Sequence, residues 1–324
     1  MNLFKRTHRL FSSASVRRCS VSMRLEASRK VEVIDGKRIA NEIETEIRSA
    51  IDSELVHGGR RPHLCAVLVG DDEGSAVYVK NKIKASERTG ITSENIHLPS
   101  STTQTDLLSL IKKLNESKFV DGILVQLPLP RHIEESAICN SVLPSKDVDG
   151  FHALQMGRLC LNMDSLAPCT PLAIVEILRR TGVNTTGKHI VVCGRSTIVG
   201  LPISIMLGSA RSYGNATVSC CHSHTSPSDL RALVGMADIV VTATGVPGLI
   251  TADMVKHGVC VIDVGITRIH DRVTSKTKLV GDVDFEGVSR KASFITPVPG
   301  GVGPVTVAML MRNTYLAYTR EINY

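Results

Sequence analysis

The stretch "HIVVCGRSTIVG", residues 189–200, decides the fold. Its first five residues, His189–Cys193, are typical of a buried strand, and a glycine-bearing turn leads from them into a helix opened by Pro202. This order places backbone N–H groups and a helix N-terminus where a pyrophosphate can bind. The turn is not a regular G-x-G-x-x-G, because Ser196 replaces the middle glycine and Gly200 falls one residue late. Taken alone, it also fits a tight packing turn.

The next predicted strand indicates which dinucleotide would bind. Residues 216–221 lead into His222-Ser223-His224, without the acid that usually bonds the ribose 2′-hydroxyl of NAD. An arginine in the turn, Arg195, and a serine suit a 2′-phosphate instead, so the sequence favours NADP over NAD. The alternative for Ser223 is an ordinary loop serine. The predicted cofactor contacts here are Gly194, Arg195, Ser196, Gly200 and Ser223.

Strands and helices alternate on both sides of this turn. The pattern predicts an α/β fold of two α/β domains with parallel sheets and a cleft between them, the C-terminal domain being Rossmann-like. The expected helices cover residues 36–55, 105–114, 134–142, 172–180 and 304–318, with a further helix from Ser75. The expected strands cover residues 64–70, 122–127, 189–193, 216–221, 238–242 and 259–264.

The helix expected from Ser75 carries "SAVYVKNKIKA", with lysines at positions 80, 82 and 84. Tyr78 and Lys82 are four residues apart and share one helical face, whereas Lys80 and Lys84 point away from it. For an arbitrary helix, the simplest interpretation is that all three lysines are solvated.

The distribution of charge argues against a nucleic-acid-binding protein. Of 38 basic and 31 acidic residues, 8 basic residues and 1 acidic residue lie in residues 1–30, which leaves 30 of each in the rest of the chain. The first 30 residues are rich in arginine and serine, and Leu3, Phe4, Leu10 and Phe11 share one helical face. This composition predicts a mitochondrial transit peptide, the alternative being a basic tail without a targeting role.

Other classes of protein find little support. No apolar run approaches the length that crosses a bilayer. The nine cysteines are scattered without a C-x-x-C or Cys/His ligand spacing, which favours reduced thiols and predicts no metal site.

Five motifs together resemble the bifunctional methylenetetrahydrofolate dehydrogenase/methenyltetrahydrofolate cyclohydrolase family in its animal mitochondrial form. They are "SAVYVKNKIKA" (75–85), "DGILVQLPLP" (121–130), "PSKDVDGFH" (144–152), "GRSTIVG" (194–200) and "TPVPGGVGPVTVAMLM" (296–311). The resemblance implies a folate-binding catalytic domain at 31–150, completed by a C-terminal helix at about 304–324, and an NAD(P)-binding domain at 151–303. It also implies a homodimer acting on tetrahydrofolate derivatives.

The resemblance also assigns roles to residues. Tyr78 would stack on the folate, Lys82 would be the cyclohydrolase base, and Asp149 would bind the pterin ring. Gln126 can donate and accept hydrogen bonds at once, and a neutral lysine amine can take a proton from water. Catalytic roles therefore fall on Tyr78, Lys82, Gln126 and Asp149. The substrate side would add Val125, Leu127, Pro299, Gly300, Gly301, Val302 and Gly303, and the cofactor side Ile266.

One departure from the family pattern bears on the cofactor. The NAD-using mitochondrial relatives have an arginine at the position of Ser223 and an aspartate at that of Asn215, which hold phosphate and a metal ion. Their absence favours NADP, with NAD as the second cofactor. Two rival functions remain at this point, a dehydrogenase without cyclohydrolase activity and a non-catalytic NADP-binding protein. The presence of both Lys82 and Gln126 argues against the first. The second would have a degraded folate pocket, but Tyr78, Lys82, Gln126 and Asp149 are all present.

Overall fold

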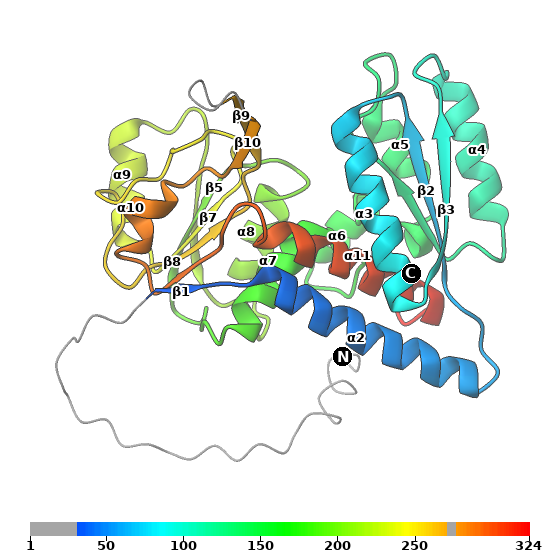
Figure 1. Ribbon diagram of the computed structural model, residues 1–324, viewed down its shortest axis with the longest axis horizontal. Helices are drawn as coiled ribbons and strands as arrows, with labels where there is room; N and C mark the ends of the chain where they lie inside the picture. Colours follow the sequence, from blue (N-terminus) through cyan, green and yellow to red (C-terminus); the bar gives the residue numbers. More distant parts are fainter. Residues whose placement is uncertain (1–30, 271–276) are drawn as a thin grey trace. The chain divides into compact units, whose positions relative to one another are not determined.

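The computed structural model describes residues 31–270 and 277–324, and these residues contain two parallel sheets of different size (Figure 1). Residues 1–30, on which the transit-peptide prediction falls, lie outside the described residues. The described residues belong to one compact unit. Within the described residues, no helix combines the length and apolar character needed to cross a membrane.

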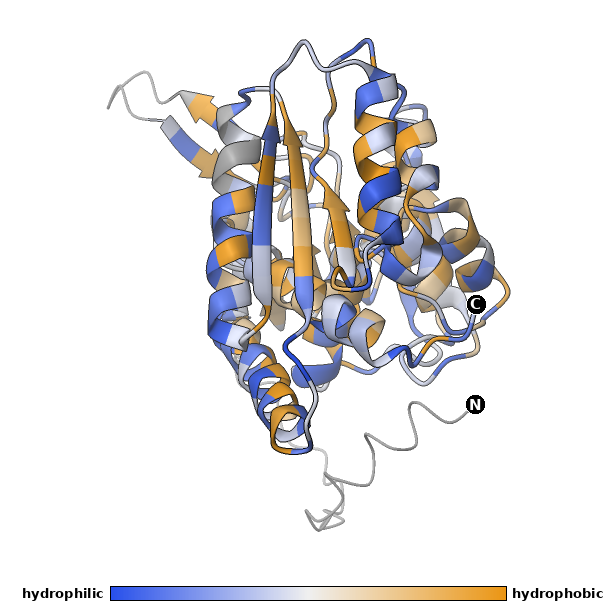
Figure 2. Cartoon of the chain, turned by 90° about the vertical axis from the view of Figure 1, so that its right-hand side faces the viewer, coloured by the Kyte–Doolittle hydropathy of each residue, from blue (hydrophilic) through white to orange (hydrophobic). Residues whose placement is uncertain are grey.

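The smaller sheet has the strand order β3-β2-β4, with all strands parallel. The central strand β2 (His63–Val69) is buried, whereas the edge strand β3 (Thr92–Leu98) is largely polar and exposed, and Figure 2 shows this contrast in hydropathy. The third strand is β4 (Gly122–Val125). Cys65, Val67 and Val69 of β2 pack in a cluster with Leu107 and Ile111 of a covering helix. The helices of this lobe are α3 (Glu73–Thr89), α4 (Gln104–Glu116) and α5 (Glu135–Ser141), followed by a 3₁₀ turn, η1 (Pro144–Lys146).

The larger sheet has the order β1-β11-β8-β7-β5-β6 and is also parallel throughout. Its strands are β1 (Glu32–Val33), β5 (His189–Cys193), β6 (Thr217–Cys221), β7 (Ile239–Thr242), β8 (Cys260–Asp263) and β11 (Phe294–Ile295). Its helices are α8 (Gly200–Gly208), α9 (Pro227–Met236) and α10 (Phe285–Ser289). An antiparallel hairpin, β9 (Thr267–His270) and β10 (Thr277–Val280), follows β8 in the chain.

Four further helices contribute to a core cluster that also contains residues of both sheets: α2 (Gly36–Val56), α6 (Ala153–Cys160), α7 (Cys169–Arg180) and α11 (Val302–Thr319). Helix α2 forms because isoleucines recur every fourth residue, from Ile39 to Ile51, and bury one face. Asp35 caps its start by accepting a hydrogen bond from the Arg38 backbone N–H. Helix α11 packs against both α2 and α7, so the end of the chain contributes to the core beside the first lobe.

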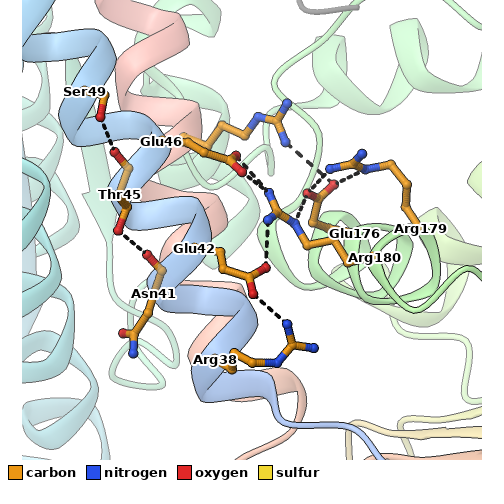
Figure 3. A network of polar contacts seen from close by, with 10 residues as sticks. Arg38, Asn41, Glu42, Thr45, Glu46, Ser49, Glu176, Arg179 and Arg180 are labelled. Carbon is orange, nitrogen blue, oxygen red and sulfur yellow. Dashed lines mark hydrogen bonds and ion pairs between the residues drawn. The ribbon is translucent and has the colours of Figure 1, made fainter. Parts of the chain in front are cut away.

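A network of charged side chains joins α2 to α7 (Figure 3). Arg180 is 12% exposed and bonds Glu176 on its own helix, at 2.7 Å, and Glu42 and Glu46 on α2, at 3.1 and 2.8 Å. Burial alone would raise the pKa of Glu176, but hydrogen bonds from Arg179 and Arg180 lower it to about 2. Because the network links two elements far apart in sequence, it fixes how α7 lies against α2.

The predicted fold class, two α/β domains with parallel sheets, is confirmed. Individual boundaries differ: α3 begins at Glu73 rather than Ser75, and α11 begins at Val302 rather than Pro304. The N-terminal strand β1 was not expected, and it belongs to the sheet of the second lobe although it precedes the first lobe in sequence.

Candidate active site

Lys82 and Gln126 meet at the carboxyl end of the smaller sheet. Lys82 lies half-buried on α3, and Gln126 directly follows β4, where its backbone N–H bonds the Val67 carbonyl at 2.9 Å. The Lys82 Nζ donates to Gln126 Oε1 at 2.9 Å, and the Gln126 amide nitrogen donates to the Leu127 carbonyl at 2.7 Å. Both ends of the glutamine amide are therefore engaged, so its oxygen is held toward the lysine.

The other two lysines of α3 behave as the helical spacing predicts. Lys80 and Lys84 are exposed, whereas Lys82 is not. Tyr78, one turn before Lys82, is 43% exposed. An aromatic ring of that size left open beside a polar pair offers a flat apolar surface for a ligand ring.

Asp149 lies in the loop that follows η1, and it interacts electrostatically with Lys82. Burial raises the pKa of Asp149 to about 6, an effect that Lys82 partly offsets. The neighbouring Asp147 was not singled out from the sequence. Its buried carboxylate accepts hydrogen bonds from the backbone N–H groups of Gly150 and His152, at 3.1 and 2.8 Å. Asp147 therefore fixes the loop that carries Asp149.

The glycine loop at residues 299–303 runs into the start of α11. A side chain at Gly36, the first residue of α2, would place its Cβ 1.7 Å from the Gly301 carbonyl oxygen, so α2 presses directly on this loop. The side chains of Val302 and, on β4, Val125 are buried in the core. These two predicted substrate contacts can therefore offer only backbone atoms to a ligand.

The turn after β5 has the geometry that a dinucleotide turn requires. Gly194 has φ +120°, and a Cβ there would lie 2.5 Å from the Ala243 carbonyl oxygen, so only glycine fits. A Cβ at Gly200, the first residue of α8, would lie 2.1 Å from the Gly194 carbonyl oxygen. The Ser196 hydroxyl accepts hydrogen bonds from the Val199 and Gly200 backbone N–H groups, which makes it a cap of the turn.

Arg195 and Ser223 occupy matching positions just beyond the ends of the neighbouring strands β5 and β6. Cys193 and Cys221 are register partners, and each of the two polar residues lies two positions beyond its cysteine. Both are exposed, so they could contact a phosphate beside the turn. Since no carboxylate ends β6, this edge of the sheet fits a 2′-phosphate better than a free 2′-hydroxyl.

A buried layer of carboxylates beneath the loops after β7 and β8 was missed by the sequence analysis. Asp282 accepts hydrogen bonds from the Thr244 backbone N–H and hydroxyl, at 2.7 and 2.8 Å, and its backbone N–H donates to Asp263. Asp263 in turn accepts from the Gly265 backbone N–H at 2.9 Å. The next residue, Ile266, is 45% exposed. The two aspartates thus hold the loop that presents Ile266, and no local motif in the sequence signals this.

The fold and the site together define a two-lobed α/β enzyme in which a dinucleotide turn accompanies a polar Lys–Gln pair. The sequence model "Tetrahydrofolate dehydrogenase/cyclohydrolase, catalytic domain" matches residues 34–149, and the model of the same family's NAD(P)-binding domain matches residues 168–322. The chain belongs to the tetrahydrofolate dehydrogenase/cyclohydrolase family.

Relatives from several organisms resemble the chain over most of its length. A mitochondrial bifunctional methylenetetrahydrofolate dehydrogenase/cyclohydrolase from Gallus gallus is 54% identical, covering 88% of this chain and 86% of its own. The bifunctional protein FolD of the bacterium Flavobacterium johnsoniae is 51% identical, covering 89% and 97%.

Solved structures agree with this family assignment. A methylenetetrahydrofolate dehydrogenase from the silkworm Bombyx mori has 47% identity and a TM-score of 0.84, covering 90% of this chain and 99% of its own. A Trypanosoma brucei dehydrogenase-cyclohydrolase, in complex with NADP and an inhibitor, has 39% identity and the same TM-score, covering 91% and 99%.

Proposed function

We propose that one site carries both activities of the family in this chain, with Lys82 as the base of the second. In the first reaction, 5,10-methylenetetrahydrofolate loses a hydride and becomes the 5,10-methenyl cation. NADP, when bound, accepts that hydride. In the second reaction, water adds to the cation and a proton is lost, which gives 10-formyltetrahydrofolate. A general base is needed only in the second reaction, because the first removes no proton.

The observation that carries this proposal is the hydrogen bond of 2.9 Å between Lys82 and Gln126. The bond holds the amine beside a side chain that can also orient water. Asp149, on the loop fixed by Asp147, would accept N–H groups of the pterin edge. The exposed ring of Tyr78 would stack on the pterin, and the backbone of residues 299–303 would line the substrate side.

The chain's own residues would hold the dinucleotide at the turn after β5. The backbone of Gly194–Gly200 would bind the pyrophosphate, while Arg195 and Ser223 would bind the 2′-phosphate. Ile266 would line the nicotinamide side. NADP is therefore the proposed cofactor and NAD the alternative. A dehydrogenase without cyclohydrolase activity and a non-catalytic NADP-binding protein are not favoured, since the named relatives are bifunctional enzymes.

Replacing Lys82 by glutamine tests the division of labour. Glutamine keeps a hydrogen-bonding end but cannot act as a base, so cyclohydrolase activity should fall by at least the ~10²–10⁴-fold typical of general-base loss. Dehydrogenase activity should largely remain, and methenyltetrahydrofolate should accumulate in the absorbance assay. The matched controls are Lys80→Gln and Lys84→Gln, which alter exposed lysines of the same helix and should leave both rates near normal. Cyclohydrolase activity surviving in Lys82→Gln would show that another group is the base.

Two further parts of the proposal concern location and assembly. Residues 1–30 would direct the protein to mitochondria. A reporter fused to them should enter the organelle, and it should stay outside when Arg6, Arg9, Arg17 and Arg18 are replaced by glutamate. A cytosolic unmutated fusion would contradict this role.

The enzyme would be a homodimer, which sedimentation should show as a species of twice the chain mass.

A further inference from the structure

A His, a Cys and a Glu lie together on strands β2 and β3 of the smaller sheet. Gln126 follows β4, on the other side of β2. His63 and Cys65 are two residues apart on β2 and therefore share one face, and Glu94 on β3 is the register partner of Cys65. One potential ligand atom from each residue lies within 4.8 Å of the other two, and the Cys65 Sγ is 3.9 Å from Glu94 Oε2. Among the described residues, these three form the group of His, Cys, Asp or Glu side chains whose spacing could hold a metal ion.

The hydrogen bonds around His63 prepare its ring for coordination. The Thr92 hydroxyl donates to the Pro62 carbonyl at 3.0 Å, so its single proton is already used. Its contact of 2.8 Å with His63 Nδ1 must then be one in which Nδ1–H donates. The neutral ring therefore carries its free lone pair on Nε2. A partner that fixes the tautomer in this way is the usual outer support of a metal-binding histidine.

The exposed Glu94 side chain leaves a route from solvent to this group. Cys65 is buried, His63 is half-buried and Glu94 is exposed, so the group opens to solvent on the glutamate side. Two charged side chains flank it. Asp121 is paired with Arg60, at 2.6 Å. The Lys146 ammonium donates to the carbonyls of Leu114, Asn115 and Ser117, which hold it at the end of α4.

We propose that His63, Cys65 and Glu94 bind a divalent transition-metal ion of the zinc type, with water in the fourth position. A sulfur, an imidazole and a carboxylate together select zinc or cobalt over magnesium or calcium. Tetrahedral zinc with these ligands needs donor atoms about 3.3–3.7 Å apart. The three atoms now lie within 4.8 Å of one another, so binding would require a rotation of the exposed Glu94 side chain and a shift of the His63 ring. The ion would join β2 to the edge strand β3 and so stabilise the folded state.

Cobalt(II) titration of the full chain, first treated with a chelator, tests this site. A thiolate ligand gives a charge-transfer absorption in the near ultraviolet, and the proposal predicts one ion per chain, displaced by zinc. In Cys65→Ser the band should vanish. In His63→Gln and Glu94→Gln the affinity should fall by more than ~10²-fold, the upper end of the loss typical for an outer partner. Thr92→Val removes only that outer partner and should weaken binding by ~10–100-fold.

A control protein removes the thiols at which adventitious binding would occur. Cys160 and Cys220 are exposed, and Cys19 lies outside the described residues. A triple variant with serine at these three positions should keep the band at full intensity. Circular dichroism checks folding, and should Cys65→Ser fail to fold, the two substitutions at His63 and Glu94 decide the matter. The absence of a band, or a band unchanged by these substitutions, overturns the proposal.

Discussion

Lys82 and Gln126 lie 44 residues apart in sequence and are joined by one hydrogen bond of 2.9 Å. The bond connects a helix to the end of a strand, so each side chain sets the position of the other. If the two act as a unit in the hydrolytic step, their losses will not add.

A double-mutant cycle on cyclohydrolase activity measures this coupling. Gln126→Ala alone should lower the rate, because the lysine loses the partner that positions it. Lys82→Gln/Gln126→Ala should be about as slow as Lys82→Gln alone, since the glutamine has nothing left to position. Strictly additive losses would contradict a shared role.

The pKa of Asp149 makes a prediction about stability. Its folded-state pKa of about 6 lies above the ordinary value of 3.8, so the folded protein binds a proton more readily than the unfolded chain. The group therefore costs stability progressively as pH rises from about 4 to about 6. Asp149→Asn removes this cost, so its gain in unfolding free energy should be about 1–1.5 kcal/mol larger at pH 7.5 than at pH 5. Urea titrations at both pH values measure it, and a gain independent of pH would contradict the raised pKa.

Arg195 should discriminate between the two dinucleotides. Arg195→Ala removes a charge-assisted hydrogen bond to the 2′-phosphate, worth about 1.5–3 kcal/mol, so NADP should bind roughly 10- to 150-fold more weakly. Binding of NAD should change little. Calorimetric dissociation constants for both nucleotides provide the measurement. Lys188→Ala, an exposed cation at the opposite end of β5, is the control. Equal losses for both nucleotides would rule out the 2′-phosphate role.

Gly36 and Gly301 provide a test of the substrate side. Alanine at Gly36 would drive its Cβ into the Gly301 carbonyl, so α2 or the 299–303 loop must shift, at a cost of about 1–3 kcal/mol. The KM for folate should rise while the dissociation constant for NADP stays the same. Gly157→Ala is a matched control, because a Cβ there meets nothing within 4 Å. An unchanged folate KM in a destabilised Gly36→Ala would separate this loop from the substrate.

Arg180 should matter more for stability than its neighbour Arg179. The Arg180 side chain is 12% exposed and bonds three carboxylates, whereas that of Arg179 is 58% exposed and bonds only Glu176. Arg180→Ala removes the ion pairs to Glu42 and Glu46 and one bond to Glu176, which keeps Arg179, and should cost about 1.5–3 kcal/mol. Arg179→Ala should cost less, because Arg180 still bonds Glu176. Denaturant unfolding compares them. Equal losses of unfolding free energy in the two variants would show that the ion pairs of Arg180 to α2 do not add to stability.

The sequence predicts the apolar elements well and the polar ones poorly. Strand β5 was expected with its observed bounds, His189–Cys193, because a continuous apolar run is typical of a buried parallel strand. Strand β3 was missed, since its exposed edge position leaves it with polar residues and no clear alternation. Strand β1 has two residues and gains its identity only from pairing with β11.

The candidate site shows the same division. Motif resemblance was enough to select Lys82, Gln126 and Asp149, but not to show that Lys82 bonds Gln126. The contacts that hold these segments in place could not be predicted, because they join parts of the chain that are far apart in sequence. The carbonyl of Gly301 lies against Gly36, 265 residues earlier in the chain.

The pairing of β1 with β11 also sets an order of events during synthesis. Glu32 and Val33 leave the ribosome 262 residues before their partners, Phe294 and Ile295. Strand β1 can therefore take its place at the edge of the larger sheet only after β11 has been made. Until then β1 has no strand to pair with. A chain interrupted before residue 294 would leave β8 as an unpaired edge strand, which can pair with other chains.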